Sequence, residues 1–431
     1  MAPLLASQEV REIVDKANGD YVHWDDFRHK FTPAQGFTLE DIWRLLRLGR
    51  MSNSRRIPLA SPDGQVFSYG MHDCVLRDLQ FVDHYAGAQL EILEPSSPST
   101  GDRDRYLINS LMQEAITSSQ LEGAAVTLQQ GKEMLRAGRK PVNPSEKMVL
   151  NNYMTMLHLK EIVGQPLSVA VIHQLQRTIT EGTLEKPDAA GRFRRPDEAV
   201  RVYDESDGTV LHLPPPAEQL PGRLERLCHF ANDTRDVPFI PPVVRAILLH
   251  FWLAYEHPYV DGNGRTARAL FYWYMLKSGY WLMEFVSVSS ALLEAPAQYR
   301  DAFIFAESDD GDATYFIVYH LKAIRRALNH LKEYLERKQQ EAAEMVQLLR
   351  GQRGLNHRQL ALLHHALKHV GAIYTFQSHA TSHVVSLATS RSDLLSLVRR
   401  GFLESRKRGR EYVFLPVRNL AEKIRGTAKT R

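Results

Sequence analysis

Residues 257–268, with the sequence HPYVDGNGRTAR, constrain this chain more than any other segment. Apolar residues at helical spacing predict a helix over 243–256, and a second helix is predicted to begin at about 263–265. Between them, Gly262 and Gly264 allow a tight turn and a close approach of the backbone to a ligand. Because the free N–H groups at a helix start attract anions, the sequence predicts a phosphate site here.

The side chains of this segment are those that phosphate chemistry uses. Arg265 and Arg268 lie three positions apart, so both are expected to face one anionic group. Asp261 offers a hard oxygen ligand for Mg²⁺ beside phosphate oxygens, and His257 is a base that titrates near neutral pH. A plain helix–loop–helix turn capped by glycine is the alternative, and it explains one glycine and at most Asp261 besides. The segment therefore favours transfer of a phosphate-containing group.

The segment resembles the signature of the Fic (Fic/Doc) family, His-x-Phe-x-(Asp/Glu)-Gly-Asn-Gly-Arg-x-x-Arg. Tyr259 is the one departure, since the family usually has Phe there, and its hydroxyl would need a partner when buried. The resemblance spans roughly residues 105–335. It implies a mainly α fold, a Fic-type helical bundle with an inserted β-hairpin flap. It also implies a protein adenylyltransferase, which moves AMP from Mg-ATP to a Ser, Thr or Tyr hydroxyl of a protein.

The resemblance assigns a role to each residue of the signature. It implies that His257 takes the proton of the target hydroxyl and that Asp261 holds Mg²⁺ between the α- and β-phosphates. It also implies that Asn263 and the backbone of Gly262 and Gly264 hold the phosphates of ATP. Arg265 and Arg268 would bind the β- and γ-phosphates. The hydroxyl would attack the α-phosphorus, with pyrophosphate leaving.

A second segment, 118–123 with the sequence SSQLEG, lies at the end of a predicted helix. Ser118 and Glu122 are four apart and are expected to share a helix face, with Gly123 as a helix stop. A polar helix end with a glycine cap is the simpler interpretation. The segment resembles the inhibitory motif of the family, (Ser/Thr)-x-x-x-Glu-(Gly/Asn). That resemblance implies that Glu122 pairs with Arg268 and keeps the γ-phosphate out, as in the class with an N-terminal inhibitory helix.

Residues 198–213 read as a β-hairpin, because two short β-rich runs flank the turn signal Asp207-Gly208. An ordinary surface hairpin is one interpretation. The family resemblance implies instead a flap that pairs with a segment of the protein substrate and aligns its hydroxyl.

The C-terminal part of the chain is basic, with 16 Lys and Arg against 6 Asp and Glu over residues 340–431. Helices are predicted at 360–369, 377–384 and 390–400, the last with Thr389 as its N-cap, followed by two strands around a basic turn at 401–414. This order resembles a winged helix-turn-helix, which would bind DNA or dock a protein. The candidate phosphate contacts are Arg391, Arg399, Arg400, Arg406, Lys407, Arg408 and Arg410. The pairs His365/His369 and His379/His383 have metal-compatible spacing but no Cys or acidic companion, so we expect no zinc site there.

We expect three regions: an N-terminal region at 1–100, a catalytic domain at 101–335 that includes the inhibitory helix, and a winged-helix domain at 345–431. Two distant cysteines indicate a reducing compartment. No signal peptide is recognisable, and the longest apolar run, 246–255, is too short to cross a membrane, so we expect a cytoplasmic protein. A homo-oligomer stays open. Two other functions are also compatible: the same fold using another nucleotide donor or removing AMP, and a DNA-binding regulator with a sensory Fic domain.

Overall fold

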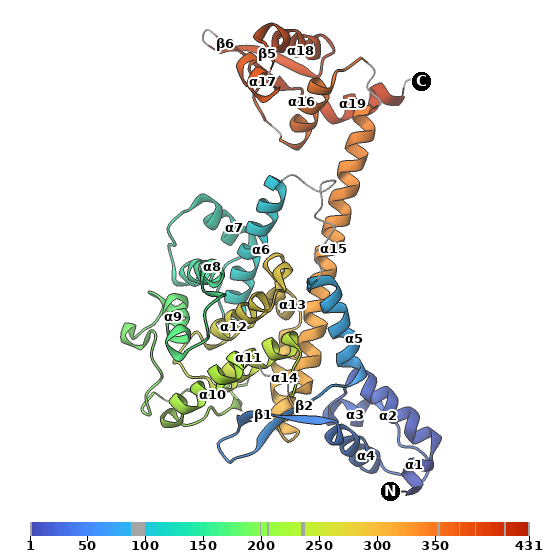
Figure 1. Ribbon diagram of the computed structural model, residues 1–431, viewed down its shortest axis with the longest axis vertical. Coiled ribbons are helices and arrows are strands. Elements are labelled where there is room, and N and C mark those ends of the chain that lie inside the picture. Colours follow the sequence, from blue (N-terminus) through green and yellow to red (C-terminus); the bar gives the residue numbers. More distant parts are fainter. Residues whose placement is uncertain are drawn as a thin grey trace. The chain divides into compact units, whose positions relative to one another are not determined.

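The computed structural model describes residues 2–87, 100–198, 200–204, 207–233, 238–350, 354–369, 371–383, 385–408 and 411–429. The chain divides into two compact units, Met1–Lys332 and Glu333–Arg431. Helices dominate both units, which confirms the mainly α fold class (Figure 1). No helix of the described ranges is long and apolar enough to cross a membrane.

The first part of the larger unit contains more regular structure than the sequence indicated. Its elements are α1 Ala2–Ala6, α2 Gln8–Asp20, α3 Trp24–Lys30, α4 Leu39–Ser52, β1 Ser54–Ala60, β2 Val66–Gly70, α5 Asp73–Val82 and the π-helical turn η1 Asp83–Gly87. Thr38 and Asp41 form a reciprocal capping box at the start of α4. Buried Arg50 donates to the Tyr315 hydroxyl at 3.0 Å, so this region is tied to the helices that follow.

A helical bundle forms the rest of the larger unit. Its helices are α6 Thr100–Gln120, α7 Leu128–Ala137, α8 Pro144–Ile162, α9 Val169–Thr180, α10 Leu220–Asn232, α11 Pro242–Glu256, α12 Asn263–Lys277, α13 Val288–Leu293, α14 Pro296–Ser308 and the first part of α15 Thr314–Arg350, which continues past Lys332 into the smaller unit. The 3₁₀ turns are η3 Pro187–Ala189, η4 Ala217–Gln219 and η5 Trp281–Phe285. α11 is apolar on nearly every face and is buried along almost its whole length. α12 packs directly against it (Figure 1), so both ends of the 257–262 loop are fixed.

The inserted hairpin consists of β3 Val202–Tyr203 and β4 Val210–His212, paired antiparallel. Gly208 has φ of 74°, and the Asp207 carboxylate accepts from the backbone N–H of Thr209 at 2.9 Å, so the predicted turn is confirmed. Of the predicted hairpin at 198–213, residues 199, 205 and 206 lie outside the described residues.

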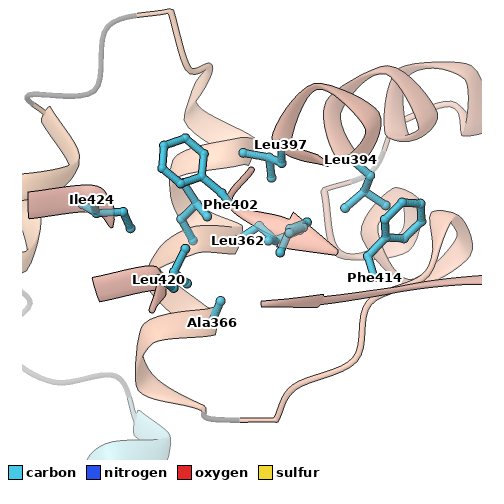
Figure 2. Close-up of a cluster of buried hydrophobic side chains, with 10 residues drawn as sticks. Leu362, Ala366, Leu394, Leu397, Phe402, Phe414, Leu420 and Ile424 are labelled. Carbon is cyan, nitrogen blue, oxygen red and sulfur yellow. The ribbon is translucent and has the colours of Figure 1, made fainter. Parts of the chain in front are cut away.

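The smaller unit has its own hydrophobic core. Its elements are α16 His357–Lys368, α17 Phe376–His383, α18 Leu387–Arg399, β5 Leu403–Arg408, β6 Glu411–Pro416 and α19 Leu420–Lys429. Figure 2 shows the core side chains, which come from helices and hairpin alike: Leu362, Ala366, Leu394, Leu397, Phe402, Phe414, Leu420 and Ile424. Three helices followed by a hairpin is the predicted order, and its assignment as a winged helix stays a prediction.

Two details of the smaller unit were predicted from sequence. Thr389 as N-cap of the third helix is wrong: α18 begins earlier, and the cap is Ser386, whose hydroxyl accepts from the backbone N–H of Thr389 at 3.2 Å. His379 lies 3.3 Å from the Asp393 carboxylate in the interior, so its pairing is structural. Within the described residues no group of three His, Cys, Asp or Glu side chains could hold a metal ion.

Candidate active site

The loop between α11 and α12 is shaped by two residues in left-handed backbone conformation. His257 has φ of 45° and ends α11, where its N–H donates to the carbonyl of Leu253 at 3.1 Å. Gly262 has φ of 81° and precedes the first residue of α12. A Cβ at Gly262 would meet the Thr180 methyl at 2.7 Å, so this position needs glycine for both conformation and space.

Asn263 braces the same loop from within. Its side-chain oxygen accepts from the N–H of Tyr259 at 2.9 Å, and its amide nitrogen donates to the carbonyl of Tyr259 at 2.8 Å. Asn263 is buried, and in this arrangement its amide holds backbone. The phosphate contact predicted for it stays a prediction.

Tyr259, the departure from the signature, is fully buried. Its hydroxyl lies 3.1 Å from Nδ1 of His173 on α9, which supplies the partner that a buried tyrosine needs. The aromatic ring points inward, and the substitution leaves the loop intact.

His257 is placed as a neutral base. Its Nδ1 lies 3.3 Å from the carbonyl of Ala254, an acceptor, which fixes the proton on Nδ1 and leaves Nε2 with a free lone pair. Burial, helped by the nearby His212, lowers the pKa of His257 to about 4. Arg194 donates to the His257 carbonyl at 2.9 Å and holds the residue from the flap side.

Asp261 and Arg265 form a contact beside the loop. Arg265 is fully buried, and its Nη2 lies 3.3 Å from both carboxylate oxygens of Asp261 while its Nη1 donates to the carbonyl of Ile179 at 3.2 Å. The Asp261 side chain is 46 % exposed, so one side of the carboxylate faces solvent. A single exposed carboxylate suits Mg²⁺, which keeps water and phosphate oxygens as its other ligands.

Arg268 is buried and contacts the end of α6. Its Nε donates to the Ser118 hydroxyl at 2.8 Å, and its Nη2 donates to the Ser118 carbonyl at 2.7 Å and to Glu122 Oε1 at 3.0 Å. Burial alone would raise the pKa of Glu122, but the positive charges of Arg268 and Arg265 outweigh it and hold the pKa below its usual value. Glu122 is therefore an anion in this pair.

The Glu122 carboxylate also occupies the predicted anion site at the start of α12. A Cβ at Gly264 would lie 2.2 Å from Glu122 Oε1, which shows how closely the carboxylate approaches this helix start. The shared helix face predicted for Ser118 and Glu122 is corrected: α6 ends at Gln120, and Glu122 lies in the following turn, before Gly123 with φ of 84°. The turn brings Glu122 to Arg268 beside Ser118.

The structure thus brings the predicted site residues into one region, but the two arginines contact different carboxylates, Arg265 that of Asp261 and Arg268 that of Glu122. The prediction that both arginines face one anionic group stays a prediction.

The hairpin is attached beside this site by charged contacts that sequence analysis missed. His212 on β4 lies 2.8 Å from the Glu307 carboxylate and 2.7 Å from the carbonyl of Tyr255. Arg300 on α14 pairs with Asp204 at 2.6 Å. The partners are about 95 residues apart in sequence, so spacing along the chain gives no signal for them. Exposed Tyr203 and Val210 leave the hairpin with apolar surface.

Comparison with known proteins shows which family this region is similar to. Residues 166–275 match the Fic/DOC family model. Protein adenylyltransferase Fic of Drosophila grimshawi is 28% identical over 165 residues, 37% of this chain and 32% of that protein. Protein adenylyltransferase Fic of Nematostella vectensis is 36% identical over 97 residues, 22% of this chain and 20% of that protein. The chain therefore spans about a third or less of these curated relatives.

Solved structures show the same fold. A Fic family protein from Desulfovibrio desulfuricans G20 superposes with a TM-score of 0.54 at 18% identity, covering 81% of this chain and 98% of that one. Fic-1 of C. elegans, residues 134–508, gives 0.53 at 18% identity, covering 77% and 86%. At this identity the likeness concerns the fold alone.

Proposed function

We propose that this chain, which carries a Fic/DOC family domain at residues 166–275, is an autoinhibited protein adenylyltransferase. In this proposal AMP passes from Mg-ATP to a Ser, Thr or Tyr hydroxyl of a protein. The observation that carries it is the buried pair Arg265 and Arg268 on α12, the helix that follows the loop beginning at His257, whose Nδ1 faces the Ala254 carbonyl. The curated relatives named above are adenylyltransferases, which supports the same chemistry.

The reaction follows from what each group can do. The hydroxyl oxygen forms a bond to the α-phosphorus, the bond from that phosphorus to the oxygen bridging to the β-phosphate breaks, and pyrophosphate leaves. The hydroxyl proton passes to Nε2 of His257, which is unprotonated at neutral pH because its pKa is low. Mg²⁺, bound through Asp261, would neutralise phosphate charge. Arg265, Arg268 and the backbone of Gly262 and Gly264 would bind the triphosphate.

Glu122 explains the restraint in this proposal. A carboxylate paired with Arg268 and set against Gly264 takes the place that a terminal phosphate would occupy. ATP then binds Arg268 only after Glu122 leaves. The resting protein is expected to transfer AMP slowly.

The hairpin is the proposed docking place for the protein substrate. Its outer surface exposes Tyr203, Val210 and Leu213, and an extended segment of another protein could add to its edge by backbone hydrogen bonds. The tethers through His212 and Asp204 would keep that edge in register with His257.

The decisive experiment uses Glu122→Gly incubated with cell lysate and Mg-ATP, with intact-protein and peptide mass spectrometry. We expect proteins that gain the mass of AMP, far more than with the wild type, and no gain with Glu122→Gly/His257→Ala. If the Glu122→Gly protein transfers no more AMP than wild type, the restraint is wrong. If no AMP adduct depends on His257, the proposed activity is wrong. Parallel reactions with other nucleotides and with AMP-modified protein test the alternative chemistries.

A second function, DNA binding by the smaller unit, is favoured by one observation. The side chains of Arg391, Arg399, Arg406 and Lys407 are exposed on α18 and β5. Arg400 is exposed as well, whereas Arg410 and the side chain of Arg408 lie outside the described residues. Basic side chains on a helix and the adjacent hairpin would contact the DNA backbone.

Gel shifts over a range of salt concentrations test it. We expect binding that weakens with salt and weakens further in Arg406→Glu/Lys407→Glu, because phosphate contacts release counterions. Arg11→Glu/Arg44→Glu, two exposed changes on α2 and α4, serves as the control of equal charge. Binding that ignores both salt and the paired substitution would refute a DNA function.

A further inference from the structure

Glu114 is a buried carboxylate that the proposed reaction does not use. It lies on α6, two turns before Glu122, with 2 % of its surface exposed. Its Oε2 accepts from the Tyr272 hydroxyl at 2.8 Å, the Ser287 hydroxyl at 2.9 Å and the backbone N–H of Ser289 at 3.0 Å, and its Oε1 accepts from the Ser289 hydroxyl. A buried carboxylate is tolerated only with such a set of donors, so this one is fully engaged.

The contact of Glu114 with α12 repeats the contact of Ser118 with α12, one helical turn away on each helix. On α6, Glu114 precedes Ser118 by four residues, and on α12, Arg268 precedes Tyr272 by four, so each pair lies one helical turn apart on its helix. Glu114 contacts Tyr272 and Ser118 contacts Arg268. Two successive turns of α6 are thereby aligned with two successive turns of α12.

The start of α13 completes the attachment. Ser287 is the N-cap of α13, and its hydroxyl lies 3.3 Å from that of Thr117 and donates to Glu114. Gln113 donates to the Ser290 hydroxyl at 3.2 Å. Since Tyr272 is buried and also accepts from the N–H of Val288 at 2.8 Å, the group that receives Glu114 is itself fixed.

We propose that Glu114 is a positioning residue that sets the register of α6 against α12 and so places Glu122 on Arg268. The inference rests on the proposed function, because it names what holds the inhibitory contact together. Glu122 itself lies in a turn beyond the helix, its side chain is 24 % exposed, and it pairs with Arg268 at 3.0 Å. The buried contacts of α6 at Glu114 determine where that turn lies.

Glu114→Gln tests this with little change of volume. The glutamine NH₂ is a hydrogen-bond donor, and it would lie among the hydroxyl and N–H donors that now contact Glu114. At least one of these hydrogen bonds is therefore lost, which weakens the attachment of α6. We expect transfer of AMP by Glu114→Gln to rise by about tenfold over wild type, the effect of losing about one charged hydrogen bond. Ser289→Ala, which removes a single hydroxyl donor, should give a smaller rise.

The four proteins wild type, Glu114→Gln, Glu122→Gly and the double variant separate the possibilities. We expect Glu114→Gln to raise transfer when Glu122 is present and to change nothing when Glu122 is already Gly. An equal effect in both backgrounds, or no rise in wild type for either Glu114→Gln or Ser289→Ala, overturns the inference. Glu146→Gln, a buried glutamate paired with Arg139, is the matched control and should leave transfer unchanged. An inactive Glu122→Gly protein would instead refute the proposed function.

Hydrogen exchange gives a readout independent of activity. If Glu114 sets the register, amides of residues 118–124 exchange faster in Glu114→Gln than in wild type, while those of α12 do not. Unchanged exchange over 118–124 contradicts the inference even if the enzyme assay fails.

Discussion

At the scale of single residues, the ionic state of the site is set by burial and by neighbouring charge acting in opposite senses. Glu122 is kept ionised by two arginines despite burial, whereas His257 is kept neutral by burial. A base with a pKa near 4 is weaker than a free imidazole but is fully available at pH 7. His257 is therefore a weaker base than free imidazole, but its protonation state at neutral pH is fixed.

We predict that the acid limb of kcat/KM for ATP, measured with Glu122→Gly, lies near pH 4 and not near 6.5. The lowered pKa means that His257 gains its proton only as the pH falls toward 4, and the rate is lost there. Glu122 raises this pKa, so its removal moves the limb no higher. A pH–rate profile with its acid midpoint at 6 or above would show that His257 is not the buried base described.

At the scale of elements, the start of α12 depends on a backbone conformation that only glycine adopts easily. We predict that Gly262→Ala lowers the free energy of unfolding by about 2 kcal/mol or more, since a left-handed alanine costs about 1–2 kcal/mol and the new methyl meets Thr180. Denaturant titration measures it.

Gly49→Ala is the matched control. Gly49 lies within α4, has no atom within 4 Å of a would-be Cβ, and should stabilise the protein by about 0.5–1 kcal/mol. Equal effects at both glycines would contradict the geometry described for Gly262.

Elements with strong local signals were predictable from sequence. The helix over 243–256 and the start of α12 follow from apolar periodicity, and the signature covers the loop 257–262 and the first residues of α12. α2 and α5 were not predicted from the sequence. α18 was started too late because two hydroxyl residues, Ser386 and Thr389, compete as caps.

The contacts that hold the site together were beyond sequence reasoning. Glu114 and Tyr272 are 158 residues apart, and nothing in either neighbourhood marks a buried carboxylate. The contact of Arg268 with Glu122 was expected from the resemblance, but one of the two bonds from Arg268 to Ser118 ends on a main-chain carbonyl, which has no sequence signature. Tertiary packing decides such contacts.

At the scale of the whole molecule, each unit contains a core of its own. Phe414 is completely buried in the smaller unit, among leucines of α16 and α18. We predict that Phe414→Ala destabilises the smaller unit by about 3–5 kcal/mol, the usual cost of such a cavity. Calorimetry should show the unfolding temperature of the smaller unit falling while that of the larger unit stays the same. The same substitution should leave AMP transfer by the Glu122→Gly protein unchanged. A concerted shift of both transitions would show that the units do not unfold separately.

In the proposed function, the contact between Glu122 and Arg268 would make the protein its own competitor for ATP. A carboxylate on the same chain acts at a fixed effective concentration, so the affinity for ATP is reduced by the fraction of molecules in which Glu122 is displaced. The ratio of ATP dissociation constants between wild type and Glu122→Gly, measured by calorimetry, thus reports the free energy of restraint without any substrate protein. A ratio of about tenfold would correspond to roughly 1.4 kcal/mol. A ligand that loosens the turn at 121–123 would raise the apparent affinity for ATP, and ATP would raise the affinity for that ligand by the same factor.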